Sequence, residues 1–68
     1  MAILKVLEIL ANSPKGWEEA TQNAVTHATK TVRNIRSVNV SNQSALVDKK
    51  GKITEYRVNV KISFEVEG

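Results

Sequence analysis

The sequence predicts an α+β domain with one helix and three strands in the order β-α-β-β, on two main observations. Residues 55–66 alternate between polar and apolar side chains, the two-residue period of a strand with one buried face. Between residues 14 and 36, apolar side chains recur at three- and four-residue steps, the period of an amphipathic helix. The two patterns predict a three-stranded antiparallel sheet with a single helix on its apolar face. Residues 1–68 are treated as one domain, because this length leaves room for only one core.

The first strand is predicted at about residues 2–11 and is apolar on both sides. Leu4, Val6 and Leu10 fall on one face, and Ile3, Leu7 and Ile9 fall on the other. A single helix can cover only one of these faces. We therefore expect the second face to contact a neighbouring subunit.

The helix is predicted at about residues 14–36. Ser13 is a suitable N-cap, and Pro14 suits the first helical position, where a missing N–H costs nothing. The predicted buried stripe is Trp17, Ala20, Ala24, Ala28, Val32 and Ile35. Because most of these side chains are small, we expect the helix to lie close to the sheet.

The second and third strands are predicted at about residues 37–48 and 52–66. They are joined by a hairpin turn at residues 48–52 in which Gly51 is available for a positive φ. Alternation in the second strand places Val38, Val40 and Leu46 on the apolar face, and Ser37, Asn39, Ser41 and Gln43 on the polar face. The last strand adds Arg57, Asn59 and Lys61 to the polar face. Such a face is solvated, forms a subunit interface or lines a ligand cleft.

Composition excludes several classes of function. The chain has no cysteine and one histidine, His27, so disulfides, thiolate sites and a zinc cluster are excluded. The net charge of +3 is spread along the chain without aromatic residues among the basic groups, so we expect no nucleic-acid binding. No apolar run is long enough to span a membrane and no signal peptide is visible, so we expect a cytoplasmic protein. No nucleophile–base pair can be assembled, so we expect no enzyme activity.

Length favours an oligomer. A chain of 68 residues buries barely enough apolar surface to offset the conformational entropy it loses on folding. Chains this short are usually stabilised by disulfides, metals or partner subunits, and the composition leaves the partner subunits.

Five segments resemble the dodecin family over essentially the whole chain. They are KVLEIL (5–10), SPKGWEEA (13–20), TVRNIR (31–36) and GKITEYRV with VKISFEV (51–66). The resemblance implies a hollow homododecamer in which the sheet wraps around one helix. It also implies a small-ligand storage protein, with riboflavin or FMN as the ligand of the flavin-binding members.

In flavin-binding dodecins a tryptophan after the helix stacks on the flavin, and a glutamine in the last strand hydrogen-bonds the ring edge. The resemblance places these positions at Ser37 and Arg57, with Arg36, Val38 and Asn39 beside them. Loss of an aromatic platform removes about 1–3 kcal/mol of stacking per ring. Arg57 still has the donors to bind a carbonyl or an anionic group.

The same segments are more similar to the calcium dodecin branch, which also lacks the tryptophan. No spacing of carboxylates indicates which residues would bind calcium. Three hypotheses follow: a cage that binds a flavin or a related flat or anionic ligand, a calcium- or cation-binding cage, and a structural cage without a ligand.

Overall fold

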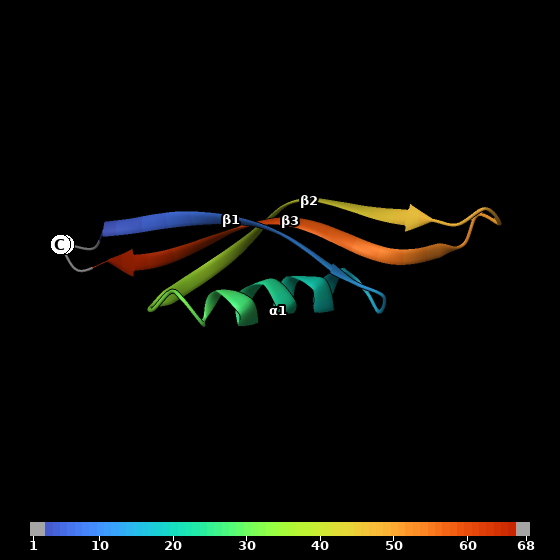
Figure 1. Ribbon diagram of the computed structural model, residues 1–68. Helices are drawn as coiled ribbons and strands as arrows, with labels where there is room; N and C mark the ends of the chain where they lie inside the picture. The colour runs from blue at the N-terminus through green and yellow to red at the C-terminus, as the bar shows by residue number, and fades with distance from the viewer. Residues whose placement is uncertain (1–2, 67–68) are drawn as a thin grey trace.

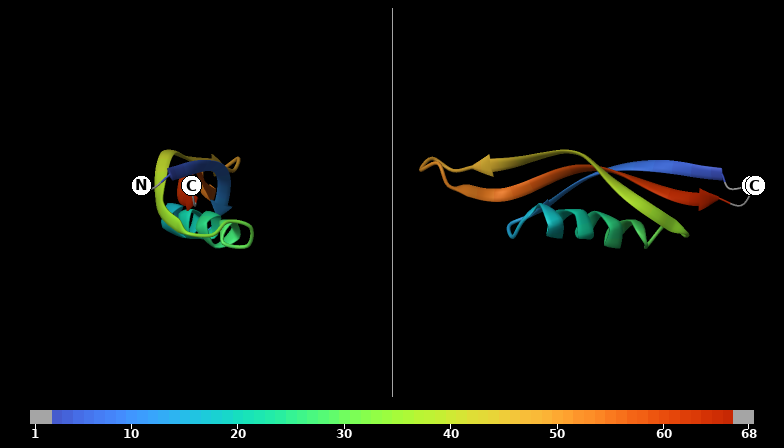
Figure 2. Two further views of the ribbon diagram at one scale, coloured as in Figure 1. Left: turned by 90° about the vertical axis from the view of Figure 1, so that its left-hand side faces the viewer. Right: turned by 180° about the vertical axis from the view of Figure 1, so that it is seen from behind.

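The structure, a computed structural model, describes residues 3–66 and has the predicted β-α-β-β order (Figure 1). The elements are β1 (Ile3–Ser13), α1 (Trp17–Ala28), β2 (Ile35–Val47) and β3 (Ile53–Val66). The strands form one antiparallel sheet in the order β1-β3-β2, so the strongly alternating β3 lies in the centre. Seen end-on, the sheet curls over α1, which lies along one of its faces (Figure 2).

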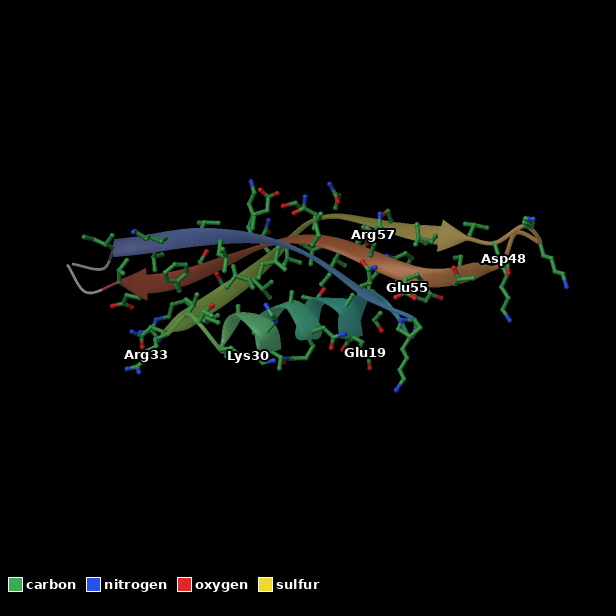
Figure 3. The ribbon with its side chains drawn as sticks, in the orientation of Figure 1. Glu19, Lys30, Arg33, Asp48, Glu55 and Arg57 are labelled. Atoms are coloured by element: carbon green, nitrogen blue, oxygen red, sulfur yellow. The ribbon has the colours of Figure 1, made fainter. Side chains whose placement is uncertain are left out.

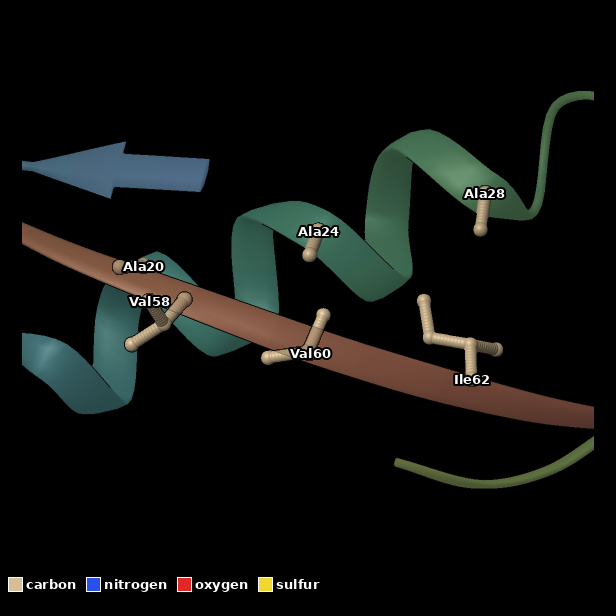
Figure 4. Close-up of a cluster of buried hydrophobic side chains, with 6 residues drawn as sticks. All are labelled: Ala20, Ala24, Ala28, Val58, Val60 and Ile62. Carbon is tan, nitrogen blue, oxygen red and sulfur yellow. The ribbon is translucent and has the colours of Figure 1, made fainter. Parts of the chain in front are cut away.

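The core lies between α1 and β3 and is built from small side chains (Figure 4). Its six buried members are Ala20, Ala24, Ala28, Val58, Val60 and Ile62. The three alanines let the helix backbone approach the central strand closely. Leu7, Ile9 and Ala11 of β1 pack beside this cluster, so theirs is the face of β1 that is covered within the chain.

The helix begins three residues later than predicted. Ser13 is the last residue of β1, opposite Tyr56, and its buried hydroxyl accepts the backbone N–H of Lys15 at 3.0 Å and donates to the Glu19 carboxylate. Ser13 therefore orders the turn before α1, and its side chain does not cap the helix. Gly16 occupies the N-cap position instead, without a side-chain hydrogen bond.

The helix also ends earlier than residue 36, at Ala28. The next turn is rich in β-branched residues, and the Thr29 hydroxyl donates to the Thr26 carbonyl at 2.6 Å. Asn34 then has a φ of 61°, a left-handed conformation that asparagine tolerates and that ends helical propagation. Ile35, placed on the helix stripe by its spacing, instead pairs with Phe64 in the sheet.

The predicted strand limits differ from the observed ones by a few residues. The first strand extends to Ser13, and its predicted start at Ala2 lies outside the described residues. The second begins at Ile35, before the predicted residue 37. The hairpin turn is as predicted, because Gly51 has a φ of 81°.

A bulge in β2 changes the predicted faces of its second half. Val40 pairs with Val60 and Asn42 pairs with Asn59, so Ser41 is an extra residue between them. After this bulge, Gln43 lies opposite Val58 on the helix side and Leu46 lies opposite Glu55 on the other side. The predicted polar position of Gln43 and the predicted apolar position of Leu46 are therefore both wrong.

Candidate functional site

The sheet face that points away from α1, here called the outer face, carries most of the predicted site. Register with β3 places three sets of side chains on it. They are Leu4, Val6, Glu8, Leu10 and Asn12 from β1; Glu55, Arg57, Asn59, Lys61, Ser63 and Glu65 from β3; and Ser37, Asn39, Asn42, Ser44 and Leu46 from β2. The outer face therefore joins an apolar border on β1 to a polar centre.

Three of the five predicted site residues lie on this face, but they are not together in one chain. Ser37 pairs with Ser63, whereas Arg57 pairs with Ser44, six positions away along β3. At about 3.4 Å per residue this separates Ser37 and Arg57 by roughly 20 Å. Asn39, opposite Lys61, lies between them. A ligand that contacts both Ser37 and Arg57 at short range needs the two residues to come from different copies.

The other two predicted residues lie elsewhere. Val38 pairs with Ile62 and points to the helix side of the sheet. Arg36 forms a salt bridge with Glu65, with its Nε and one terminal nitrogen each 3.0 Å from the same carboxylate oxygen. Arg36 is thus held against the end of β3 and is not free to follow a ligand at Arg57.

Asn59 occupies the centre of the outer face, between Leu10 of β1 and Asn42 of β2. Its Oδ1 is buried and has no hydrogen-bond partner in the structure. A buried acceptor without a partner costs about 1–3 kcal/mol. The polar alternation predicted the face of Asn59, but the burial of its oxygen depends on neighbouring strands and had no local signal. Because the oxygen is already covered within one copy, the side chains around it have to move before a donor or a cation from outside the chain can reach it.

No aromatic ring reaches the outer face, although the chain has three. Trp17 belongs to α1 and donates its Nε1–H to the Ser44 carbonyl at 2.9 Å. Its ring packs edge-on against Tyr56 of β3, with centroids 4.9 Å apart and an interplanar angle of 78°. Tyr56 and Phe64 point to the helix side of β3, in step with the buried Val58. The residues present therefore do not fit a flavin stacked between aromatic rings on this face.

The carboxylates of one copy do not form a metal site within residues 3–66. No group of three His, Cys, Asp or Glu side chains converges there. Asp48 accepts the backbone N–H groups of Lys50 and Lys52 at 2.8 and 3.0 Å, and Glu65 is paired with Arg36. A cation site built from carboxylates would therefore need ligands from more than one copy.

A hollow lies on the helix side of the sheet, between α1 and β2. This opening, here called the helix groove, has a volume of about 830 Å³. Its apolar wall consists of Trp17 and Val25 from the helix and Val38 and Val40 from the strand. Lys15, Glu18, Glu19, Gln22 and Gln43 are among its polar lining residues. Val38 thus contributes to this groove and not to the outer face.

Comparison with known proteins agrees with the fold. The Dodecin family model matches residues 3–67. The chain belongs to the dodecin family. It is 41% identical over 66 residues to calcium dodecin from Mycobacterium tuberculosis, covering 97% of this chain and 92% of the relative.

Solved dodecin structures have the same fold as this chain. A single-residue mutant of Thermus thermophilus dodecin superimposes with a TM-score of 0.90 at 28% identity and covers all of both chains. Dodecin from Streptomyces coelicolor gives 0.90 at 28% identity, covering 98% of this chain and 94% of the other. Calcium dodecin from M. tuberculosis, a calcium-chelating antigen with a calcium-binding site, gives 0.80 at 38% identity, covering 96% and 91%. The predicted family and fold class are confirmed.

α1 lacks the length and the apolar run that a helix needs to cross a bilayer, and it is the one helix of the described residues.

Proposed function

We propose that this dodecin is a non-enzymatic, homo-oligomeric binding protein of the cytoplasm, with its ligand site formed where the outer faces of neighbouring copies meet. The observation that carries the proposal is the buried Asn59 Oδ1, which lacks a partner at the centre of that face. Leu10, its neighbour on β1, is 69% exposed in the single chain, and Val6 and Leu4 farther along β1 are 60% and 56% exposed. Contact with another copy would bury this apolar border and bring a second polar centre near the first.

Calcium is the ligand supported by the oxygen atoms of this face, although Arg57 and Lys61 also place positive charge there. The polar centre offers amide, hydroxyl and carboxylate oxygens, from Asn39, Asn42, Asn59, Ser44 and Glu8, and Ca²⁺ takes six to eight oxygen ligands. The outer face has no aromatic ring for a flavin. The similarity to a calcium dodecin supports the same choice.

A flat or anionic ligand such as riboflavin or FMN is the second candidate, and Arg57 is the observation in its favour. Arg57 lies on the outer face two residues from Asn59, and its guanidinium can donate two hydrogen bonds to a carbonyl or a phosphate. Without stacking we expect such binding to be weak. An assembly without any retained ligand is the third outcome.

The first prediction is that purified protein binds Ca²⁺, with heat in calorimetric titration and a rise in melting temperature. Asn59→Ala should weaken calcium binding about tenfold, because loss of one oxygen ligand costs about 1.4 kcal/mol. Asn23→Ala, an amide removed from the exposed surface of α1, is the matched control and should leave the affinity unchanged.

Added riboflavin and FMN form the second arm of this experiment. Quenching of flavin fluorescence at micromolar protein, without a calorimetric signal for Ca²⁺, would indicate that the ligand is a flavin and not calcium. An intact oligomer that gives neither heat with Ca²⁺ nor quenching of flavin fluorescence would indicate a structural cage without a ligand. A monomer by native mass spectrometry would overturn the proposal as a whole.

A further inference from the structure

The helix groove is an apolar surface that the chain leaves open on its own. α1 packs on β1 and β3 through its alanines, and this leaves the adjoining half of β2 without a cover. Val38 and Val40 are consequently 36% and 37% exposed although they point to the same side of the sheet as the core. The half-buried Trp17 and Val25 face them across the groove.

A second unpaired apolar surface lies at the end of the β2–β3 hairpin. Residues 46–54, here called the hairpin tip, continue beyond the first turn of α1, so no helix covers them (Figure 1). Leu46, Val47 and Ile53 in this segment are 43%, 58% and 43% exposed. A two-stranded hairpin without further packing is only marginally stable in water. The tip therefore has the composition of a segment that packs against something else.

The hairpin tip and the mouth of the helix groove carry opposite charge. Lys49, Lys50 and Lys52 surround the turn, where the carboxylate of Asp48 is directed at backbone N–H groups. At the start of α1 the mouth of the groove is lined by Glu18 and Glu19 and also by Lys15, whose Nζ lies 4.0 Å from the Glu19 carboxylate, so these three residues give it a net charge of −1. Figure 3 shows Asp48 at the far end of the hairpin and Glu19 near the start of the helix. Complementary potentials of this kind orient two surfaces and exclude other pairings.

The tip cannot reach the groove of its own chain. Val40 in the groove and Val47 at the tip belong to the same extended strand, seven residues apart. At about 3.3 Å per residue they are separated by roughly 23 Å, and the strand directs the tip away from α1. A hairpin tip that occupies the groove must therefore belong to a second copy.

We propose that the hairpin tip of one copy inserts into the helix groove of a neighbouring copy, with Val47 and Ile53 against the apolar wall and the lysines at the acidic mouth. The inference rests on the homo-oligomeric part of the proposed function. The contact joins two different surfaces, so it runs head to tail and closes into a ring when the rotation between copies permits. Leu46 of the tip also belongs to the outer face, so this contact adjoins the outer face at the hairpin, whereas the helix groove lies on the opposite side of the sheet.

Cysteine cross-linking tests the contact directly, because the natural chain contains no cysteine. Gln22→Cys lies in the helix groove and Val47→Cys lies at the hairpin tip. When the two single variants are mixed, reassembled and oxidised, we expect a disulfide-linked Gln22→Cys/Val47→Cys dimer on a non-reducing gel. A disulfide needs Cα atoms within about 7 Å, so the product reports close contact. Asn23→Cys is the matched control, because Asn23 faces β1 from the same helix and should give little product.

Charge reversal gives a second and independent readout. Lys49→Glu with Lys50→Glu should reduce the assembled fraction at low ionic strength, and Glu18→Lys in the same chain should restore part of it. Trp17 is the single tryptophan and lies in the groove, so detachment of the tip should shift its emission to the red and increase quenching by acrylamide. Lys30→Glu, beyond the opposite end of α1, should change neither signal.

The outcomes separate the inference from the proposed function. An intact oligomer that gives no cross-link between positions 22 and 47 and no effect of Lys49→Glu with Lys50→Glu would overturn the hairpin contact alone. A chain that is monomeric at all concentrations would overturn the homo-oligomer and the contact with it.

Discussion

Three alanines determine how closely α1 approaches the sheet. Ala20, Ala24 and Ala28 recur every fourth residue and are at most 1% exposed. They oppose Val58, Val60 and Ile62 of the central strand (Figure 4). Because each of these three positions places only a methyl group against the strand, a larger side chain there has little room.

Ala24→Leu is therefore expected to destabilise the fold. Three additional carbon atoms must displace the helix or strand, and overpacking of this kind costs about 1–3 kcal/mol. Urea unfolding of both proteins at the same protomer concentration measures the difference in the free energy of unfolding. Thr26→Leu, on the exposed side of the same helix, is the control and should shift the midpoint little. Equal midpoints for the two variants would mean that α1 does not pack as closely as the structure has it.

Single residues also mark the limit of what the sequence predicts. The alternation of residues 55–66 correctly placed Val58 in the core and Arg57 on the outer face. The same rule failed for Gln43, because one extra residue at Ser41 reverses the faces of residues 42–46 in β2. A bulge depends on pairing with another strand and has no local signal in a polar stretch such as residues 41–44.

At the scale of elements, the limits of the helix and strands are determined by competition between local sequence patterns and pairing with other strands. The stripe continuing through Val32 and Ile35 predicted a helix to residue 36, but pairing of Ile35 with Phe64 extends the sheet instead. Asn34 makes the change of direction with its left-handed backbone, and its carbonyl accepts the Glu65 N–H at 3.0 Å. Helical spacing alone could not show that a strand partner was available.

The hairpin turn is a local element whose conformation the sequence predicted correctly. Gly51 donates its N–H to the Asp48 carbonyl at 3.0 Å with a φ of 81°. Gly51→Ala should lower the free energy of unfolding by about 1–2 kcal/mol, because a Cβ disfavours the left-handed conformation. Chemical denaturation measures this loss.

Gly51→Asn is the matched variant, because asparagine adopts a left-handed conformation more readily than alanine. It should retain more of the stability than Gly51→Ala. Equal losses for the two substitutions would indicate that a contact of the new side chain, and not the backbone conformation, causes the effect. No heavy atom lies within 4 Å of a Cβ at this position, so the backbone conformation is the expected cause of the loss.

At the scale of the whole molecule, the shape indicates a subunit and not a self-sufficient monomer. The Cα radius of gyration is 14.0 Å and the principal extents are 52 × 19 × 13 Å. A compact chain of this length would have a radius of gyration of about 11 Å. Within residues 3–66 the buried core is limited to six alanine, valine and isoleucine side chains, while other apolar residues of β1 and of the hairpin tip are exposed. The sequence of the first strand predicted that a neighbouring subunit covers one of its faces, because apolar residues on both faces can be recognised without knowing the partner.

Assembly through the outer face makes a final prediction about β1. Val6→Lys with Leu10→Lys should convert the oligomer to smaller species, because the two side chains contribute about 1.5–3 kcal/mol each when fully buried and a buried lysine adds a desolvation penalty. Light scattering and native mass spectrometry measure the subunit number. Thr26→Lys on the exposed side of α1 adds one positive charge without touching the outer face, and it should leave the subunit number unchanged. Since neither Val6 nor Leu10 belongs to the core cluster, the double variant should still fold. A folded double variant of full native mass would show that β1 faces solvent in the assembly, and the ligand site would then have to lie on a different surface from Asn59.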